Sequence, residues 1–393
     1  MCFLVTRLDQ MNSMEQSFFT SKTLPASRLT FFLAGVGMGA WAPLVPFAKE
    51  RAQIGEAELG LLLLCLGTGS MCMMPFVARL ANFIGCRRTV YLASAFTAIA
   101  LIGLSTATSY WMLLAFLFLF GAAVGTADVN MNLQGSLVER HHGKQMMSGF
   151  HGLFSVGNIV SAGAVSLLLW LGLSPVESIA ALILGGAAVI LSYGRHMLPF
   201  AELEGAPAKA RPTRLVLLLG ILCFIAFLVE GSMLDWSAVY LTSSRDVQPN
   251  VAGVGYAAFS VTMALGRLSG DWVVNRLGSR AVLFCGSLLA MAGMALAVSV
   301  NHWLISVIGF VLVGAGISNL VPIFCSKAGH QTVLPVAQAL AIINAIGYMG
   351  ILMGPAAIGF LAHETSLGFS LLLTAFLLLL VMVSAKVASY PKA

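Results

Sequence analysis

Three carboxylates lie inside long apolar stretches of the sequence: Asp128, Glu230 and Asp235. A charge near the centre of a bilayer costs at least ~2.5 kcal/mol, so each acid needs a partner or a task that compensates for this cost. A carboxyl group in such surroundings can alternate between a charged and a neutral form as water reaches it from one side or the other. We treat all three as candidate proton-coupling groups, with Asp128 preferred.

The spacing around Asp128 indicates which neighbours share its side of a helix. Asp128 and Asn132 are four residues apart and lie on one helical face, whereas Asn130 points nearly the opposite way. We expect the first two to face the interior of the protein. The alternative is that Asp128 pairs with a distant arginine or caps a broken helix end.

A second polar stripe comprises His151, Ser155 and Asn158, which follow one another at i, i+4 and i+7. Such a stripe inside an apolar run must face protein or water. Asn158 is the better candidate for a solute ligand. For His151, proton handling and a role as a hydrogen-bonded gate residue remain equally open.

The stretch 230–240 holds the other two acids and two aromatic residues, Trp236 and Tyr240. Glu230 and Asp235 are five residues apart, about 140° around a helix, so both cannot point into one narrow cavity. We expect one of the two acids to support packing and the other to take part in proton coupling. For Trp236, an interfacial position near the end of the run is the alternative to a solute contact.

The candidate solute contacts are polar or aromatic side chains within apolar runs of both halves of the chain. They are Trp41, Asn132, His151, Ser155, Asn158, Trp236, Asn319, Asn344 and Tyr348. Amide and indole groups suit a neutral polar solute better than an anion, since no Lys or Arg is expected deep within a run.

The elements that must position these residues are membrane helices. The chain is 59% hydrophobic and 9% charged, with a mean hydropathy of +0.93, which excludes a soluble globule of 393 residues. Its apolar runs are near the roughly 20 residues that a helix needs to cross a bilayer, and not the about 10 of a barrel strand. Lys and Arg are confined to short linkers, so the net charge of +6 does not indicate a nucleic-acid partner.

Twelve membrane spans are predicted. They cover about 29–48, 59–79, 89–108, 111–138, 146–172, 177–194, 215–242, 251–274, 281–300, 303–325, 335–362 and 367–386. Of the 21 Lys and Arg residues, we assign all but Lys49, Arg51 and Arg245 to the side of the two termini. This bias predicts that both termini are cytoplasmic.

The two halves of the chain repeat one another at an offset of 193 residues. The pattern N-x-x-G-x-R occurs at 82–87 and again at 275–280, and two further glycine pairs keep the same offset. Those pairs are Gly121 with Gly314 and Gly157 with Gly350. Such a repeat indicates a duplicated membrane unit.

The polar segment at the middle of the chain sets the predicted domain boundaries. We expect a cytoplasmic tail (1–28), a first six-helix bundle (29–194), a cytoplasmic central loop (195–214), a second six-helix bundle (215–386) and a short cytoplasmic tail (387–393). The predicted fold class is thus an all-α membrane protein with two pseudo-symmetric bundles.

These features resemble the major facilitator superfamily, whose loop signature is G-x-x-x-D-R-x-G-R-R. The matching stretch 78–88 reads ARLANFIGCRR, which keeps the second glycine and the arginine pair but has Ala78 and Asn82 at the first glycine and the acid. The resemblance implies a cytoplasmic gate. Its candidate residues are Gly85, Arg87, Arg88, Arg267, Asp271, Gly278 and Arg280.

Within the superfamily, the chain is most similar to the fucose-proton symporter branch. The similarity rests on GTADVNMN at 125–132 and GRLSGDW at 266–272. That branch also has an acid in its first helix, where this chain has Ala42. The offset of 193 maps Ala42 onto Asp235, so we hypothesise that the acid moved to the symmetric helix.

Several absences narrow the chemistry. No G-x-x-x-x-G-K-[ST], H-E-x-x-H or G-x-S-x-G occurs, which argues against direct use of ATP and against an enzyme. The seven cysteines form no C-x-x-C, so we expect no disulfide framework, no metal and no cofactor.

The interpretation that follows is a secondary transporter of the bacterial inner membrane. We expect it to work as a monomer in the lipid bilayer by alternating access, and to carry a small polar solute with protons. The resemblance implies that this solute is sugar-like. One alternative is a proton-driven exporter of apolar compounds, favoured by a Met-rich interior and 24 Phe. Another is a transporter-like membrane sensor, which would need a signalling domain.

Overall fold

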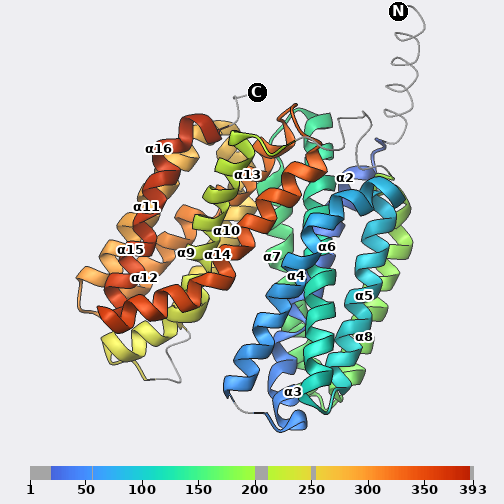
Figure 1. The fold of residues 1–393 in the computed structure, drawn as a ribbon, viewed down its shortest axis with the longest axis horizontal. Coiled ribbons are helices and arrows are strands. Elements are labelled where there is room, and N and C mark those ends of the chain that lie inside the picture. Colours follow the sequence, from blue (N-terminus) through green and yellow to red (C-terminus); the bar gives the residue numbers. More distant parts are fainter. Residues whose placement is uncertain (1–18, 55, 200–210, 249–253, 390–393) are drawn as a thin grey trace, which may run out of the picture. The chain divides into compact units, whose positions relative to one another are not determined.

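A computed structural model describes residues 19–54, 56–199, 211–248 and 254–389, and these residues form helices and connecting turns without a strand (Figure 1). The first part holds α2 (Thr23–Gly39), η1 (Ala42–Leu44), α3 (Val45–Ala52), α4 (Glu56–Ile84), α5 (Cys86–Thr106), α6 (Tyr110–His142), α7 (Met147–Trp170), α8 (Pro175–Tyr193) and η2 (Gly194–His196). The second holds α9 (Arg214–Arg245), α10 (Val254–Leu277), α11 (Ser279–Ser299), α12 (Trp303–Ile317), α13 (Leu320–Gly329), α14 (Val336–Glu364), α15 (Leu367–Phe376) and α16 (Leu378–Ala388). The all-α prediction is confirmed. Most of both predicted tails and of the central loop lies outside the described residues.

The helices account for the twelve predicted spans. Ten segments among the described residues are long and apolar enough to cross a membrane, with α12–α13 and α15–α16 each counted as one. The other two predicted spans are α2 with α3, where α2 has only 17 residues, and α10, which carries Arg267, Asp271 and Arg276. The lower apolarity of α10 marks it as a helix with polar contacts inside the protein.

The chain divides into two compact units. The first comprises 1–142, 153–210 and 332–341, and the second comprises 143–152, 211–331 and 342–393. The first turns of α7 are therefore grouped with the second unit, and the start of α14 with the first. Within the first unit, α6 packs along α4 and α5. Within the second, α11 and α10 pack against α12.

The internal repeat is visible in the helix ends. Helix α5 spans 86–106 and α11 spans 279–299, so both bounds differ by 193 residues. Each helix is preceded by a glycine of positive φ, Gly85 at 87° and Gly278 at 84°, with ψ of 155° and 145°. This region of backbone space is essentially reserved for glycine. The repeated N-x-x-G-x-R pattern thus encodes one sharp turn that is used twice.

Close helix contacts repeat as well. A Cβ at Gly121 would strike the carbonyl of Leu66, and a Cβ at Gly314 would strike the carbonyl of Phe259. Gly121 and Gly314 are 193 residues apart, and so are Leu66 and Phe259. Glycine is required here because the backbones of neighbouring helices touch.

Two arginines explain exceptions to the charge bias of the loops. Arg51 donates from Nε to the Ala107 carbonyl and from Nη2 to the Leu104 carbonyl, at 2.8 Å each. Arg245 donates from Nη2 to the carbonyls of Ala297 (3.0 Å) and Val298 (2.8 Å). Leu104 and Ala297 are again 193 apart. Each arginine satisfies carbonyls left free at a helix C-terminus, where a cation is favoured.

The symmetry fails at two helix breaks, which the sequence did not predict. The first predicted span is interrupted at 40–44, where Pro43 and Pro46 start η1 and α3, whereas its repeat α9 is continuous through 32 residues. The tenth predicted span breaks between Ile317 and Leu320, whereas its repeat α6 is continuous. Proline cannot donate the hydrogen bond that would continue the first helix. The first break includes Ala42, whose equivalent in the unbroken α9 is Asp235.

Candidate functional site

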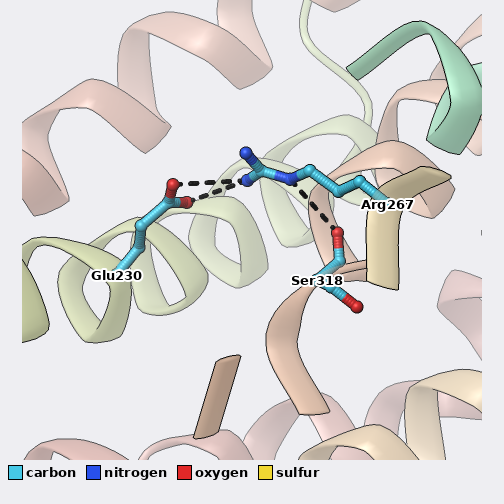
Figure 2. A network of polar contacts seen from close by, with 3 residues as sticks. All are labelled: Glu230, Arg267 and Ser318. Atoms are coloured by element: carbon cyan, nitrogen blue, oxygen red, sulfur yellow. Dashed lines mark hydrogen bonds and ion pairs between the residues drawn. The ribbon is translucent and has the colours of Figure 1, made fainter. Parts of the chain in front are cut away.

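An ion pair lies within the helices of the second unit. Arg267 of α10 donates from Nη2 to Glu230 of α9, at 3.1 Å to Oε2 and 3.3 Å to Oε1 (Figure 2). The side chain of Arg267 is 8% exposed and that of Glu230 is 29% exposed. Because each charge compensates the other, the pair lets two charged side chains remain in apolar helices.

The position of Arg267 corrects two points of the sequence analysis. We grouped it with the loop cations of the gate and expected no Lys or Arg deep in a span. The structure places it near the middle of α10, buried and paired with Glu230. The pair is formally neutral. The preference for a neutral solute therefore rests on the fact that Glu230 compensates the charge of Arg267, and no longer on an absence of Lys and Arg from the spans.

The same arginine supports the break between α12 and α13. Its Nε donates to the Ser318 carbonyl at 3.4 Å (Figure 2). Asn319 Nδ2 donates to the Gly266 carbonyl at 3.1 Å. Side chains at Gly266 and Gly270 would collide with Ser318 and Asn319. The motif at 266–272 therefore gives α10 a surface that fits the broken helix, and Asn319 serves as part of this packing.

The far end of α10 contacts the start of α7 within the second unit. Asp271 Oδ1 accepts from the Gly149 backbone N–H at 2.9 Å. Asn275 Nδ2 donates to the Gln145 carbonyl at 2.9 Å. A carboxylate at a helix N-terminus is favoured by the free N–H groups and the helix dipole. Asp271 therefore binds the start of α7, and its role in a gate stays a prediction.

Asp235, Trp236 and Tyr256 lie near the ion pair. Asp235 is exposed on α9, and the Tyr256 ring of α10 is close enough to Asp235, Glu230 and Arg267 to feel their charges. Trp236 has a buried Nε1 for which the described residues supply no acceptor, and its ring faces Gly359 of α14. The sequence analysis missed Tyr256, although its position three helical turns before Arg267 on one face could have revealed it.

Asn344 and Tyr348 lie one turn apart on α14. Asn344 is buried, and the Tyr348 ring meets Phe227 of α9 edge to face, with centroids 5.9 Å apart. Both therefore belong to the interior of the second unit, on the side of α14 that faces α9.

In the first unit, Asn130 and Asn132 of α6 have different hydrogen-bond partners, as their spacing along the helix suggests. Asn132 Nδ2 donates to the Asp128 carbonyl at 2.9 Å. Asn130 instead binds α5: its Nδ2 donates to the Cys86 carbonyl at 3.0 Å, and its Oδ1 accepts from the Cys86 thiol at 3.2 Å. Asn130 is thus a packing residue that holds the start of α5.

Trp41 lies at the break of the first span. It is 5% exposed and belongs to the apolar core with Leu44, Leu104 and Phe120. Its Nε1 is buried and has no acceptor among the residues that the structure describes. A buried donor without a partner costs about 1–3 kcal/mol, which favours any state in which an acceptor reaches it.

Comparison with known proteins decides the family. The sequence pattern of the Major Facilitator Superfamily matches residues 29–248 and 218–392. An uncharacterized MFS-type transporter of Yersinia pestis is 49% identical over 362 residues, which cover 92% of this chain and 94% of that protein. The chain belongs to the Major Facilitator Superfamily. It is therefore a multi-pass membrane transporter, and enzyme activity is not characteristic of its relatives.

Solved superfamily structures confirm the fold. A structure of the Escherichia coli fucose:proton symporter FucP aligns with a TM-score of 0.78 at 16% identity, covering 95% of this chain and 100% of that chain. The proton:xylose symporter XylE aligns with a TM-score of 0.74 at 13% identity, covering 94% and 95%. The twelve-helix fold of two six-helix bundles predicted from the sequence is thus confirmed.

The superfamily loop signature has a local structural role in the first unit. Arg87 donates from Nε (3.0 Å) and Nη2 (2.7 Å) to the Met197 carbonyl, at the end of η2. A Cβ at Gly85 would strike the Pro199 carbonyl, whereas no atom of the described residues lies within 4 Å of a Cβ at Gly278. Lys392, the repeat equivalent of Pro199, lies outside the described residues. Arg88 is exposed, and so is Arg280, the repeat equivalent of Arg87. Arg87 therefore anchors the chain where it leaves the first bundle.

The polar stripe of α7 is shared between the two units. His151 is buried within the part grouped with the second unit, where the charge of Arg267 acts on it. Ser155 and Asn158 belong to the first unit, and α7 lies close to α2 there because Gly35 and Gly39 have no side chains. The structure thus assigns His151 and Asn158 different surroundings.

Proposed function

We propose that this superfamily transporter carries a small polar, sugar-like solute together with a proton, by alternating access. The observation that carries the proposal is the set of three carboxylates within membrane helices, of which Glu230 is paired with Arg267. The names of FucP and XylE as proton symporters of fucose and xylose support the solute class, with the fold alone as the link.

Asp128 is the preferred coupling acid. Glu230 is engaged by Arg267, so its loss of charge would leave a buried guanidinium without its partner. Asp235 is exposed on α9 and is the second candidate. An acid that exchanges protons must be reached by water from each side of the membrane in turn. We propose that Asp128, within the long α6, is this acid.

Two indole donors support a solute rich in oxygen. Trp41 Nε1 and Trp236 Nε1, one in each unit, are both buried and have no acceptor within the described part of the chain. A hydroxyl or ring oxygen accepts a hydrogen bond from an indole N–H. We propose that these tryptophans contact the solute together with the asparagines of α6, α7 and α14. A neutral solute fits because the charge of Arg267, which lies deep in α10, is compensated by Glu230.

A screen in proteoliposomes tests the function. Purified protein is reconstituted, and uptake of radiolabelled neutral sugars and polyols is measured with and without an inward pH gradient. We expect at least one of them to accumulate only with the gradient. Equal uptake with and without it would exclude coupling, and gradient-driven movement of apolar dyes alone would favour the exporter.

We also propose that the protein lies in the bacterial inner membrane as a monomer, with both termini in the cytoplasm and bundles at 29–194 and 215–386. Reporter fusions test the orientation. A fusion after Lys386 is expected to show cytoplasmic activity, whereas one at Arg245 should show activity only outside. Cytoplasmic activity at Arg245 would refute the predicted topology.

A further inference from the structure

Four basic side chains gather at one end of the first unit. Lys22 precedes α2, Arg87 opens α5, and Arg195 and His196 form η2. The charges of Arg195, Lys22 and Arg87 all act on the His196 imidazole, and Arg195 Nε donates to His196 Nε2 at 3.2 Å. Residues far apart in the sequence thus form one basic cluster.

Apolar packing beneath this basic cluster holds it together. Ala26 of α2, Val90 of α5 and Met197 after η2 are buried against one another. Arg87 adds two hydrogen bonds to the Met197 carbonyl. The three segments are therefore fixed relative to one another, and their cations are held close despite mutual repulsion.

No carboxylate compensates the basic cluster within the part of the chain that the structure describes. None of its four residues forms an ion pair there. The first turns of α2 and α5 contain no acidic residue, and no N-cap side chain accepts a hydrogen bond at either helix start. The free N–H groups in the first turn of α5 add to the positive potential of the side chains. Helix α2 adds less, because Pro25 has no N–H and the N–H groups of Thr23 and Ala26 donate to the carbonyls of Thr20 and Lys22.

We propose that the basic cluster binds the phosphate of an anionic phospholipid headgroup. The cluster lies where membrane helices begin, and this is the depth at which lipid phosphates are found. Basic pockets between membrane helices recognise such headgroups, and helix N-termini bind phosphate. Arg87 uses only Nε and Nη2 on Met197, so Nη1 can donate to a phosphate oxygen.

The second unit offers a matched control. Arg280 is the repeat equivalent of Arg87, and Lys386 is that of Tyr193, next to η2. Both are exposed. Removing Arg280 and Lys386 therefore lowers the net charge by two at the corresponding end of the second unit without touching the basic cluster.

Native mass spectrometry of the full-length protein tests the proposal. Binding of cardiolipin and of phosphatidylcholine is titrated for the wild type, for Lys22→Gln with Arg195→Gln, and for Arg280→Gln with Lys386→Gln. Two lost interfacial charges should weaken cardiolipin binding roughly 30-fold. We expect this loss in the first variant only, with phosphatidylcholine binding unchanged.

Three outcomes would overturn the proposal. An equal loss in both variants would indicate general attraction by charge. Displacement of cardiolipin by millimolar inorganic phosphate would indicate a site for free phosphate. A gain of cardiolipin binding on replacing Glu202 and Glu204, which lie outside the described residues, with Gln would indicate that the chain's own acids occupy the basic cluster.

Discussion

Asp128→Asn is expected to abolish accumulation of solute against a gradient and to preserve exchange of solute across the membrane. A pH difference of one unit is worth about 1.4 kcal/mol, which supports roughly tenfold accumulation of a solute carried with one proton. Asn resembles the protonated acid but cannot release a proton. The accumulation ratio should therefore fall to about one, while counterflow of labelled solute against unlabelled solute continues.

Asp235→Asn is the matched control for this experiment, because it neutralises an acid in the second unit and keeps the ion pair of Glu230 with Arg267. If Asp128 is the coupling acid, Asp235→Asn should retain gradient-driven uptake. Wild-type accumulation by Asp128→Asn would make Asp128 structural. Loss of accumulation in Asp235→Asn alone would move the coupling to the position that is symmetric to Ala42.

The repeated and periodic features of the sequence were those that predicted the fold. Apolar runs of helix length located the spans, and the pattern at 82–87 and 275–280 located the duplication. The structure extends this repeat to Leu66 and Phe259 and to the carbonyls of Leu104 and Ala297. Such contacts join residues about 50 positions apart, so no local pattern could reveal them.

Long-range pairing also explains what was missed at the candidate site. Arg267 was grouped with loop cations because its partner Glu230 lies 37 residues away on another helix. The break beside Asn319 has no proline at the break itself and depends on packing against Gly266 and Gly270. The break near Trp41 is explained by Pro43 and Pro46. The sequence alone did not predict it, because prolines in membrane helices are often accommodated without a break.

Loss of one member of the Glu230 and Arg267 pair is expected to destabilise the protein more than loss of both. Arg267→Met leaves a carboxylate without its cation and leaves the Ser318 carbonyl without a donor. Breaking a buried pair costs roughly 3–5 kcal/mol, and the 29% exposure of Glu230 places this case near the lower end. Replacing both residues with Met should recover most of that loss, since a well-packed apolar pair often substitutes for an ion pair.

A double-mutant cycle measures this coupling. Unfolding of Arg267→Met, Glu230→Met and the double variant is followed in detergent, with the exposed Arg280→Met as the control, which should stay within about 0.5 kcal/mol of the wild type. Hydrogen exchange at 315–322 should rise most in Arg267→Met, because Arg267 Nε is the donor to Ser318. Additive and small losses in the cycle would mean that the two charges do not stabilise one another. The break between α12 and α13 would then be maintained by Gly266, Gly270 and Asn319 without help from the ion pair.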